Sequence, residues 1–299
     1  MDSALSTVAL PAALAVVMLG LGLSLTVGDF ARVGRQPRAV AVALALQLLV
    51  LPAVCVGIVL AFDLPPVLAV GMLLLAASPG GTTANLFSHL FRGDVALNVT
   101  LTAVNSLVAV ITLPVVTNLA IGWFDPADGG SLGLQFGKTV QVFAVVLVPV
   151  ALGMLVRRRS PAFADRMDRP VRVLSAAVLA LVIVGTILAE RENVGDYLRD
   201  VGLPALLFCL VSLTLGFVVP RALGIVRRQA VAGAFEIGVH NSTLAIAVAI
   251  SVLDSVELAV PAAVYGVLMF PVAAAFGWAV TRGSRDEAAV PEPVAGVRR

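Results

Sequence analysis

Long apolar segments separated by short polar stretches follow one another along nearly the whole chain. A helix that crosses a bilayer needs about 17–25 mostly apolar residues, and each segment meets that length. Nine spans are expected, at 7–28, 38–61, 66–91, 94–122, 134–156, 170–189, 200–219, 228–252 and 256–281. The pattern therefore predicts an all-α polytopic membrane protein with about nine transmembrane helices.

Composition supports this class and weakens two others. Hydrophobic residues make up 60% of the chain and charged residues 13%, whereas a soluble domain carries about 25% charged residues. The sequence contains no nucleophile elbow, no metalloprotease motif and no nucleotide loop, so an enzyme is not expected. The basic residues form no tract suited to nucleic acid. The bilayer is the expected partner, and Cys55 and Cys209 are interpreted as packing residues within apolar segments.

Arginines are concentrated in alternate loops. All except Arg191 and Arg199 fall on the side that also carries the C-terminus, whereas the opposite loops are acidic. The positive-inside rule then predicts an external N-terminus and a cytoplasmic C-terminus, in a bacterial inner membrane. The stretch 283–299, with two prolines, is expected to be a disordered cytoplasmic tail.

Polar residues interrupt two of the expected spans. One interruption is Ser78-Pro79-Gly80-Gly81-Thr82-Thr83-Ala84-Asn85, and the other is Glu236-Ile237-Gly238-Val239-His240-Asn241-Ser242. Proline removes a backbone donor and glycine permits unwound dihedral angles. Unwound backbone at membrane depth is tolerated only beside protein or a water-filled cavity. Both spans are therefore predicted to be broken helices.

The two broken spans are predicted to belong to an inverted-topology repeat. Pro114 follows Gly80 by 34 residues and Pro271 follows Gly238 by 33, and the two spans run in opposite directions. Broken helices in matching halves of a chain are typical of secondary transporters that bind substrate near the bilayer midplane.

Glu236 is the one carboxylate inside a membrane-length apolar segment, with no Arg or Lys at the same depth. Such a group costs at least about 2.5–3.5 kcal/mol on insertion scales, so it usually faces a cavity, a partner or an ion. Asn98, Thr102 and Asn105 are spaced i, i+4, i+7 and share one helix face. Oxygen ligands of this kind suit a hard cation. The half-helix that begins near Thr82 favours an anion at its N-terminus.

In these residues the chain resembles the bile acid:sodium symporter family. The resemblance rests on 18–26 with Asp29-Phe30, Gln47 with Pro52, the 78–85 break, 92–97, Pro114 and 236–242. It implies a panel domain and a core domain, and the two broken helices cross in the core. The family usually has ten helices, and its first has no counterpart among the nine expected here. The implied division is a panel helix at 1–33, the first half of the core at 34–122, panel helices at 123–195, the second half of the core at 196–282, and the tail.

The resemblance also implies the site residues. A first sodium site would fall on Asn85, Asn98, Thr102 and Glu236; a second on Gln47, Glu236 and His240; and substrate would lie near Thr82, Thr83, Asn241 and Ser242. His240 replaces the family's common glutamine, and imidazole nitrogen is a poor sodium ligand, which weakens the second site. Ala84 likewise offers no hydroxyl where a serine is common. Because 268–270 is apolar, bile acid is not the expected substrate.

The resulting hypothesis is sodium-coupled symport of a small organic anion by alternating access. No cofactor is expected beyond sodium as the coupling ion. Two alternatives stay open. One is a proton-linked or sodium-independent organic anion carrier, suggested by His240 close to Glu236. The other is a membrane receptor that binds a ligand without moving it.

Overall fold

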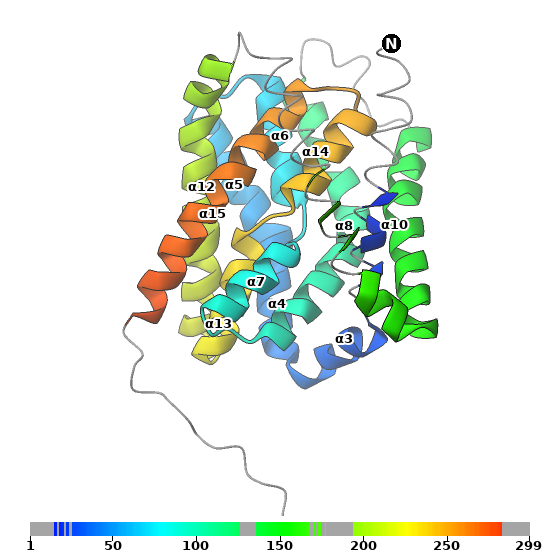
Figure 1. The fold of residues 1–299 in the computed structure, drawn as a ribbon. Coiled ribbons are helices and arrows are strands. Elements are labelled where there is room, and N and C mark those ends of the chain that lie inside the picture. The colour runs from blue at the N-terminus through cyan, green and yellow to red at the C-terminus, as the bar shows by residue number, and fades with distance from the viewer. Residues whose placement is uncertain are drawn as a thin grey trace, which may run out of the picture.

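A computed structural model shows the chain as a bundle of helices (Figure 1). It describes residues 26–125, 136–167 and 194–282, with a few positions between 15 and 23 and between 170 and 177. The expected spans at 7–28 and 170–189 lie largely outside the described residues, so the total of nine spans stays a prediction. The division into panel and core domains stays one as well.

Helices account for almost all of the described chain. In order they are α3 (Val27–Ala31), η2 (Arg32–Arg35), α4 (Pro37–Ala45), the π-helical η3 (Leu46–Val50), α5 (Leu51–Ala61), α6 (Pro66–Ala77), α7 (Thr82–Leu90), α8 (Val95–Phe124), α10 (Phe136–Arg159), α12 (Val194–Ala222), α13 (Arg227–Gly238), α14 (Ser242–Ser251), η4 (Glu257–Ala259) and α15 (Val260–Thr281).

Four stretches of the described chain are long and apolar enough to cross a membrane. They are Pro37–Ala61, Val95–Phe124, Leu198–Ala222 and Glu257–Thr281, and two shorter apolar helices are α6 and α14. After an interruption, α6 is followed by the short helix α7. In the same way α13 is followed, after an interruption, by α14. The structure therefore confirms the prediction of a helical protein with membrane-length apolar helices, and it contains both predicted helix breaks.

The two breaks are in direct contact. In Figure 1, α6 and α14 occupy the upper half of the bundle and α7 and α13 the lower half, so the broken helices run in opposite directions. Gly80 and His240 form an isolated antiparallel bridge. The amide of Asn241 donates to the carbonyl of Pro79 at 2.8 Å. Backbone groups freed by one break are thus satisfied by the other, as the hydrocarbon region requires.

Close packing of small residues holds α13 in place. A Cβ added to Gly216 of α12 would lie 2.7 Å from the Cα of Ala234, so the two helices approach closely there. On its other sides α13 contacts α7 and α8. Small residues commonly permit such approaches between membrane helices. The result is a tightly surrounded helix that carries Glu236 in its last turn.

The π-helical turn Leu46–Val50 joins α4 to α5 and precedes Pro52. A proline inside a helix has no N–H and its ring crowds the carbonyl four residues earlier, so the hydrogen-bond ladder must shift. A single π-turn is a common form of that shift, frequently at functional sites. Gln47 lies in this turn and is buried, with 2% of its surface exposed.

Candidate ion and substrate site

The carboxylate of Glu236 lies at the crossing of the two breaks and is fully buried. Thr102 donates its hydroxyl to Oε2 at 2.6 Å, and Asn105 donates its side-chain amide to Oε1 at 3.0 Å. Gly80 of the first break lies directly against the carboxylate, since a Cβ added to it would lie 2.6 Å from Oε1. Both donors are neutral, and the two ion pairs found among the described residues involve Asp29 and Asp165 instead.

Three successive contacts join α8 to α13, one for each helical turn. The amide of Asp94 donates to the carbonyl of Arg228 at 2.9 Å. One turn further along, the Asn98 side chain donates to the carbonyl of Ala232 at 2.7 Å. The Thr102 contact with Glu236 is the third. Because both partners advance by four residues each time, the two helices run side by side in the same direction.

Several buried side-chain oxygens near the breaks and on α8 have no hydrogen-bond partner among the described residues. They are Oδ1 of Asn85, Asn98 and Asn105, and Oε1 of Gln47. A buried polar atom without a partner is costly, and native structures rarely leave one without a reason. Carboxylate, amide and hydroxyl oxygens are the ligands that hard cations prefer. The donor chemistry around Glu236 therefore fits a sodium ion.

Two of the residues expected at a second sodium site, Gln47 and His240, converge on the carbonyl of Ser78. Gln47 donates Nε2 to this oxygen at 3.1 Å and to the carbonyl of Ala76 at 3.1 Å. His240 Nδ1 lies 3.1 Å from the same Ser78 oxygen. Since a carbonyl only accepts, Nδ1 carries the proton in this contact. Two N–H donors thus meet on this oxygen, while Gln47 Oε1 and His240 Nε2 have no partner among the described residues.

Aromatic rings enclose His240. Phe208 stacks on it with 5.4 Å between ring centroids, and Tyr265 meets it edge-on at 5.5 Å. The imidazole is 1% exposed, and its Nε2 has no hydrogen-bond partner among the described residues. The ring therefore occupies a dry position directly beside the crossing.

The expected substrate residues begin two half-helices. Thr82 and Thr83 open α7, and Ser242 opens α14 after Asn241. Asn241 Oδ1 accepts from the amide of Leu244 at 3.0 Å and so caps α14. Because Gly80 pairs with His240, the N-terminal ends of α7 and α14 meet at the crossing. Helix N-termini favour negative charge.

The remaining expected residues surround these ends. A Cβ added to Gly81 would lie 3.9 Å from the Cβ and Cγ of Asn241, so this side chain lies beside the first break. The hydroxyl of Ser242 is buried without a partner among the described residues. It faces Gly266 of α15, where an added Cβ would lie 3.2 Å from it.

Three contacting residues lie outside the sets expected for the two sodium sites and the substrate. Asn105, which its i, i+4, i+7 spacing with Asn98 and Thr102 placed among the candidate oxygen ligands, bonds Glu236 directly. Tyr265 donates its hydroxyl to the carbonyl of Gly238 at 2.9 Å, and the Cys209 thiol lies 3.8 Å from the same oxygen. Both satisfy the last turn of α13, and no sequence pattern pairs them with Gly238.

A helical membrane bundle in which two oppositely directed broken helices meet beside a buried carboxylate is the architecture of a secondary transporter. The chain belongs to the sodium bile acid symporter family, whose family model matches residues 11–196. Membership places it among membrane transporters and not among enzymes, as the sequence predicted.

Three relatives are 27–30% identical to this chain over the aligned residues. An uncharacterized sodium-dependent transporter, YocS of Bacillus subtilis, is 28% identical over 85% of this chain and 77% of its own length. The probable chloroplast sodium/metabolite cotransporter BASS3 of rice is 30% identical over 95% of this chain and 67% of its own. The human ileal sodium/bile acid cotransporter is 27% identical over 80% and 68%. The chain spans 60% of the rice chloroplast relative BASS2.

Proposed function

We propose that the chain is a sodium-coupled symporter of a small organic anion that works by alternating access. The observation that carries the proposal is the Glu236 carboxylate, fully buried at the crossing and held only by neutral donors among the described residues. A buried charge without a counter-ion is strongly destabilising. A sodium ion would neutralise it using oxygens that are otherwise unpartnered.

Sodium would be held by Glu236 with Asn85, Asn98 and Thr102. The amide oxygens of the two asparagines are buried and unpartnered among the described residues. Thr102 already lies 2.6 Å from the carboxylate, so its oxygen is in reach of the same ion. The ion is transported cargo in this scheme. Its binding ties α8 and α13 to the first break.

The organic anion would lie against the N-terminal ends of α7 and α14, near Thr82, Thr83, Asn241 and Ser242. The dipoles of two helices there favour a carboxylate or a sulfonate. Neutralising Glu236 with sodium removes the like charge that would repel this anion. Sodium must favour the anion-binding state by about 1–3 kcal/mol, or about 5–150-fold in affinity, for the coupling to matter.

Movement of the core (34–122 and 196–282) against the panel (1–33 and 123–195) would expose the crossing to each side in turn. The arginine-rich loops would face the cytoplasm, with the N-terminus outside, in a bacterial inner membrane.

Uptake into proteoliposomes tests this function. Carboxylates and sulfonates are first screened for thermal stabilisation of the purified protein in sodium chloride and in potassium chloride. A compound that stabilises only in sodium is then supplied, radiolabelled, to vesicles with an inward sodium gradient or an equal potassium gradient. We expect uptake only with sodium. Equal uptake under both gradients would reject sodium coupling.

His240 supports a second candidate, a proton-linked carrier. Its buried ring bonds the first break at Ser78 while Nε2 lacks a partner among the described residues. For this candidate, a pH gradient without sodium drives uptake, and His240→Gln abolishes the response. Uptake that responds neither to the pH gradient nor to the His240→Gln substitution would exclude the proton-linked carrier.

A further inference from the structure

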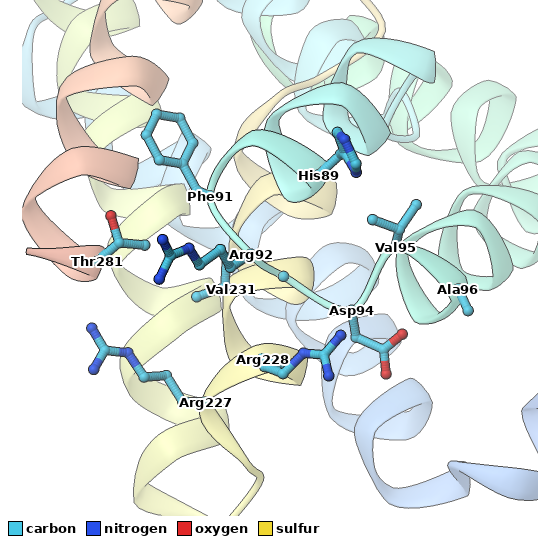
Figure 2. Close-up of a pocket in the computed structure, with 11 residues that line it drawn as sticks. His89, Phe91, Arg92, Asp94, Val95, Ala96, Arg227, Arg228, Val231 and Thr281 are labelled. Carbon is cyan, nitrogen blue, oxygen red and sulfur yellow. The ribbon is translucent and has the colours of Figure 1, made fainter. Parts of the chain in front are cut away.

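A basic pocket lies at the end of the bundle opposite α6 and α14. Its volume is about 630 Å³, and it is lined by the C-terminal end of α7, the start of α8, the start of α13 and the end of α15. Figure 2 shows the side chains that enclose it. Glu236 and the other residues assigned to ion or substrate binding are not among those that line it, so the pocket is separate from the crossing.

Positive charge dominates the pocket. Arg92, Arg227 and Arg228 line it together with His89, whereas Asp94 alone of its described lining residues is acidic. Neither of the two ion pairs in the described part of the chain includes these arginines. In Figure 2 the guanidinium groups of Arg92 and Arg227 lie on the side of Thr281, and that of Arg228 on the side of Asp94.

The Asp94 carboxylate neutralises little of the positive charge of the pocket arginines. Asp94 Oδ1 accepts from the amide of Leu97 at 3.0 Å, and Oδ2 accepts from the side-chain amide of Gln36 at 3.2 Å. Both of its oxygens therefore have partners other than the arginines. In addition, α13 begins at Arg227 with no side chain capping its first turn. Its positive dipole end adds to the charge in the pocket.

The pocket is joined to the crossing by the helices that form it. From Arg227 and Arg228, α13 leads to Glu236 in its last turn. From the first break, α7 leads to His89, and Arg92 follows in the turn after α7. The three contacts between α8 and α13 begin at Asp94 and Arg228, which both line the pocket. A ligand that bridges these residues would hold the outer ends of two half-helices together.

We propose that this pocket binds a phosphate-bearing anion, from a lipid headgroup or from a soluble phosphate compound, and thereby clamps the ends of α7 and α13. Guanidinium groups recognise phosphate with paired, charge-assisted hydrogen bonds. Three guanidinium groups, from the start of α13 and from the turn after α7, surround one cavity and match a ligand with several acceptor oxygens. These arginines could instead serve only to orient the chain in the membrane by the positive-inside rule. That role would not require them to surround a pocket.

Thermal unfolding of the purified full-length protein provides the test, read from the fluorescence of Trp123 and Trp278. Inorganic phosphate and pyrophosphate are titrated at constant ionic strength, because exposed charges are screened by salt. In a second arm, the protein is placed in nanodiscs of phosphatidylcholine alone or with phosphatidylglycerol. The pocket variant is Arg92→Gln/Arg227→Gln/Arg228→Gln.

The matched control variant, Arg35→Gln/Arg158→Gln/Arg159→Gln, removes the same charge from exposed positions outside the pocket. We expect the wild type and the control to be stabilised by phosphate or by the anionic lipid, and the pocket variant to lose at least about tenfold in apparent affinity. The lysine triple variant, which keeps the charge without the paired bonds, should be intermediate. Should the glutamine triple variant fail to fold, the single variant Arg92→Gln should still bind phosphate or the anionic lipid more weakly than the wild type, by a smaller factor.

The arm that responds identifies the source of the phosphate. Stabilisation in neither arm, or an equal loss in the pocket and control variants, would overturn the proposal. The readout needs no transport, so a binding result stands apart from the outcome of the sodium uptake experiment.

Discussion

Replacing Gly80 with alanine should separate the two breaks. A Cβ at this position would lie 2.5 Å from Cδ of Glu236 and 2.6 Å from its backbone carbonyl oxygen. Favourable separations of nonbonded carbons are about 3.5–4.0 Å, so the two segments must move apart by about 1 Å. The Glu236 side chain could rotate away, but its backbone oxygen belongs to α13 and cannot.

The cost follows from the contacts at the crossing. Overpacking of this kind costs about 1–3 kcal/mol. Movement of the first break would also lengthen the 2.8 Å bond from Asn241 to Pro79, worth about 1 kcal/mol. The sum, about 2–4 kcal/mol, corresponds to a melting temperature lower by roughly 5–15 °C on the scale of chains of 150–250 residues. Stabilisation by sodium should be lost as well, since the first break would no longer lie against the Glu236 carboxylate.

Gly81→Ala is the matched control. It adds the same methyl group one residue away, where the nearest atoms lie 3.9 Å from the added Cβ, and its backbone is extended, with φ −119° and ψ 179°. Both variants are purified in detergent and melted in sodium chloride and in potassium chloride. We expect Gly81→Ala to melt like the wild type. Equal melting temperatures for the two variants would mean that the close approach of Gly80 to α13 is wrong.

Three further substitutions examine the contacts around Glu236. Glu236→Gln keeps its hydrogen bonds, since the new amide can donate to Thr102, so the variant should fold normally. Its affinity for sodium, read from thermal stabilisation, should fall at least about tenfold; an affinity equal to that of the wild type would exclude this carboxylate from the mechanism. Thr102→Val should weaken sodium binding similarly, whereas Thr117→Val, which removes a buried hydroxyl without a partner among the described residues, should not; titrations that weaken equally would contradict the assignment. Tyr265→Phe removes the bond to Gly238 and should cost about 0.5–1.5 kcal/mol in thermal unfolding with sodium binding retained; an unchanged melting temperature would dismiss this bond.

The helix breaks could be predicted from the sequence because local chemistry determines them. Pro79 and Gly80 prevent a regular helix, and α6 accordingly ends at Ala77 and α7 begins at Thr82. Glu236 was identified because one carboxylate in an apolar segment is unusual whatever the fold. The spacing of Asn98, Thr102 and Asn105 correctly placed three polar residues on one helix face.

Partners that depend on tertiary packing could not be predicted. Helix periodicity shows that Asn98 and Asn105 share a face, but not that Asn98 bonds the backbone of Ala232 while Asn105 bonds Glu236. Tyr265 satisfies a carbonyl 27 residues away in the sequence, a pairing set only by how α15 lies against α13. The π-helical turn at 46–50 also went unpredicted, since a proline can shift a helical ladder in several ways.

The junction between the breaks is made by main-chain atoms, through the Gly80–His240 bridge and the Asn241 to Pro79 bond. Nearly every amino acid offers the same main-chain groups, so most side chains around the junction can change without dismantling the joint itself. The glycine at position 80 is the main restriction on that freedom, because any larger residue there would press against Glu236.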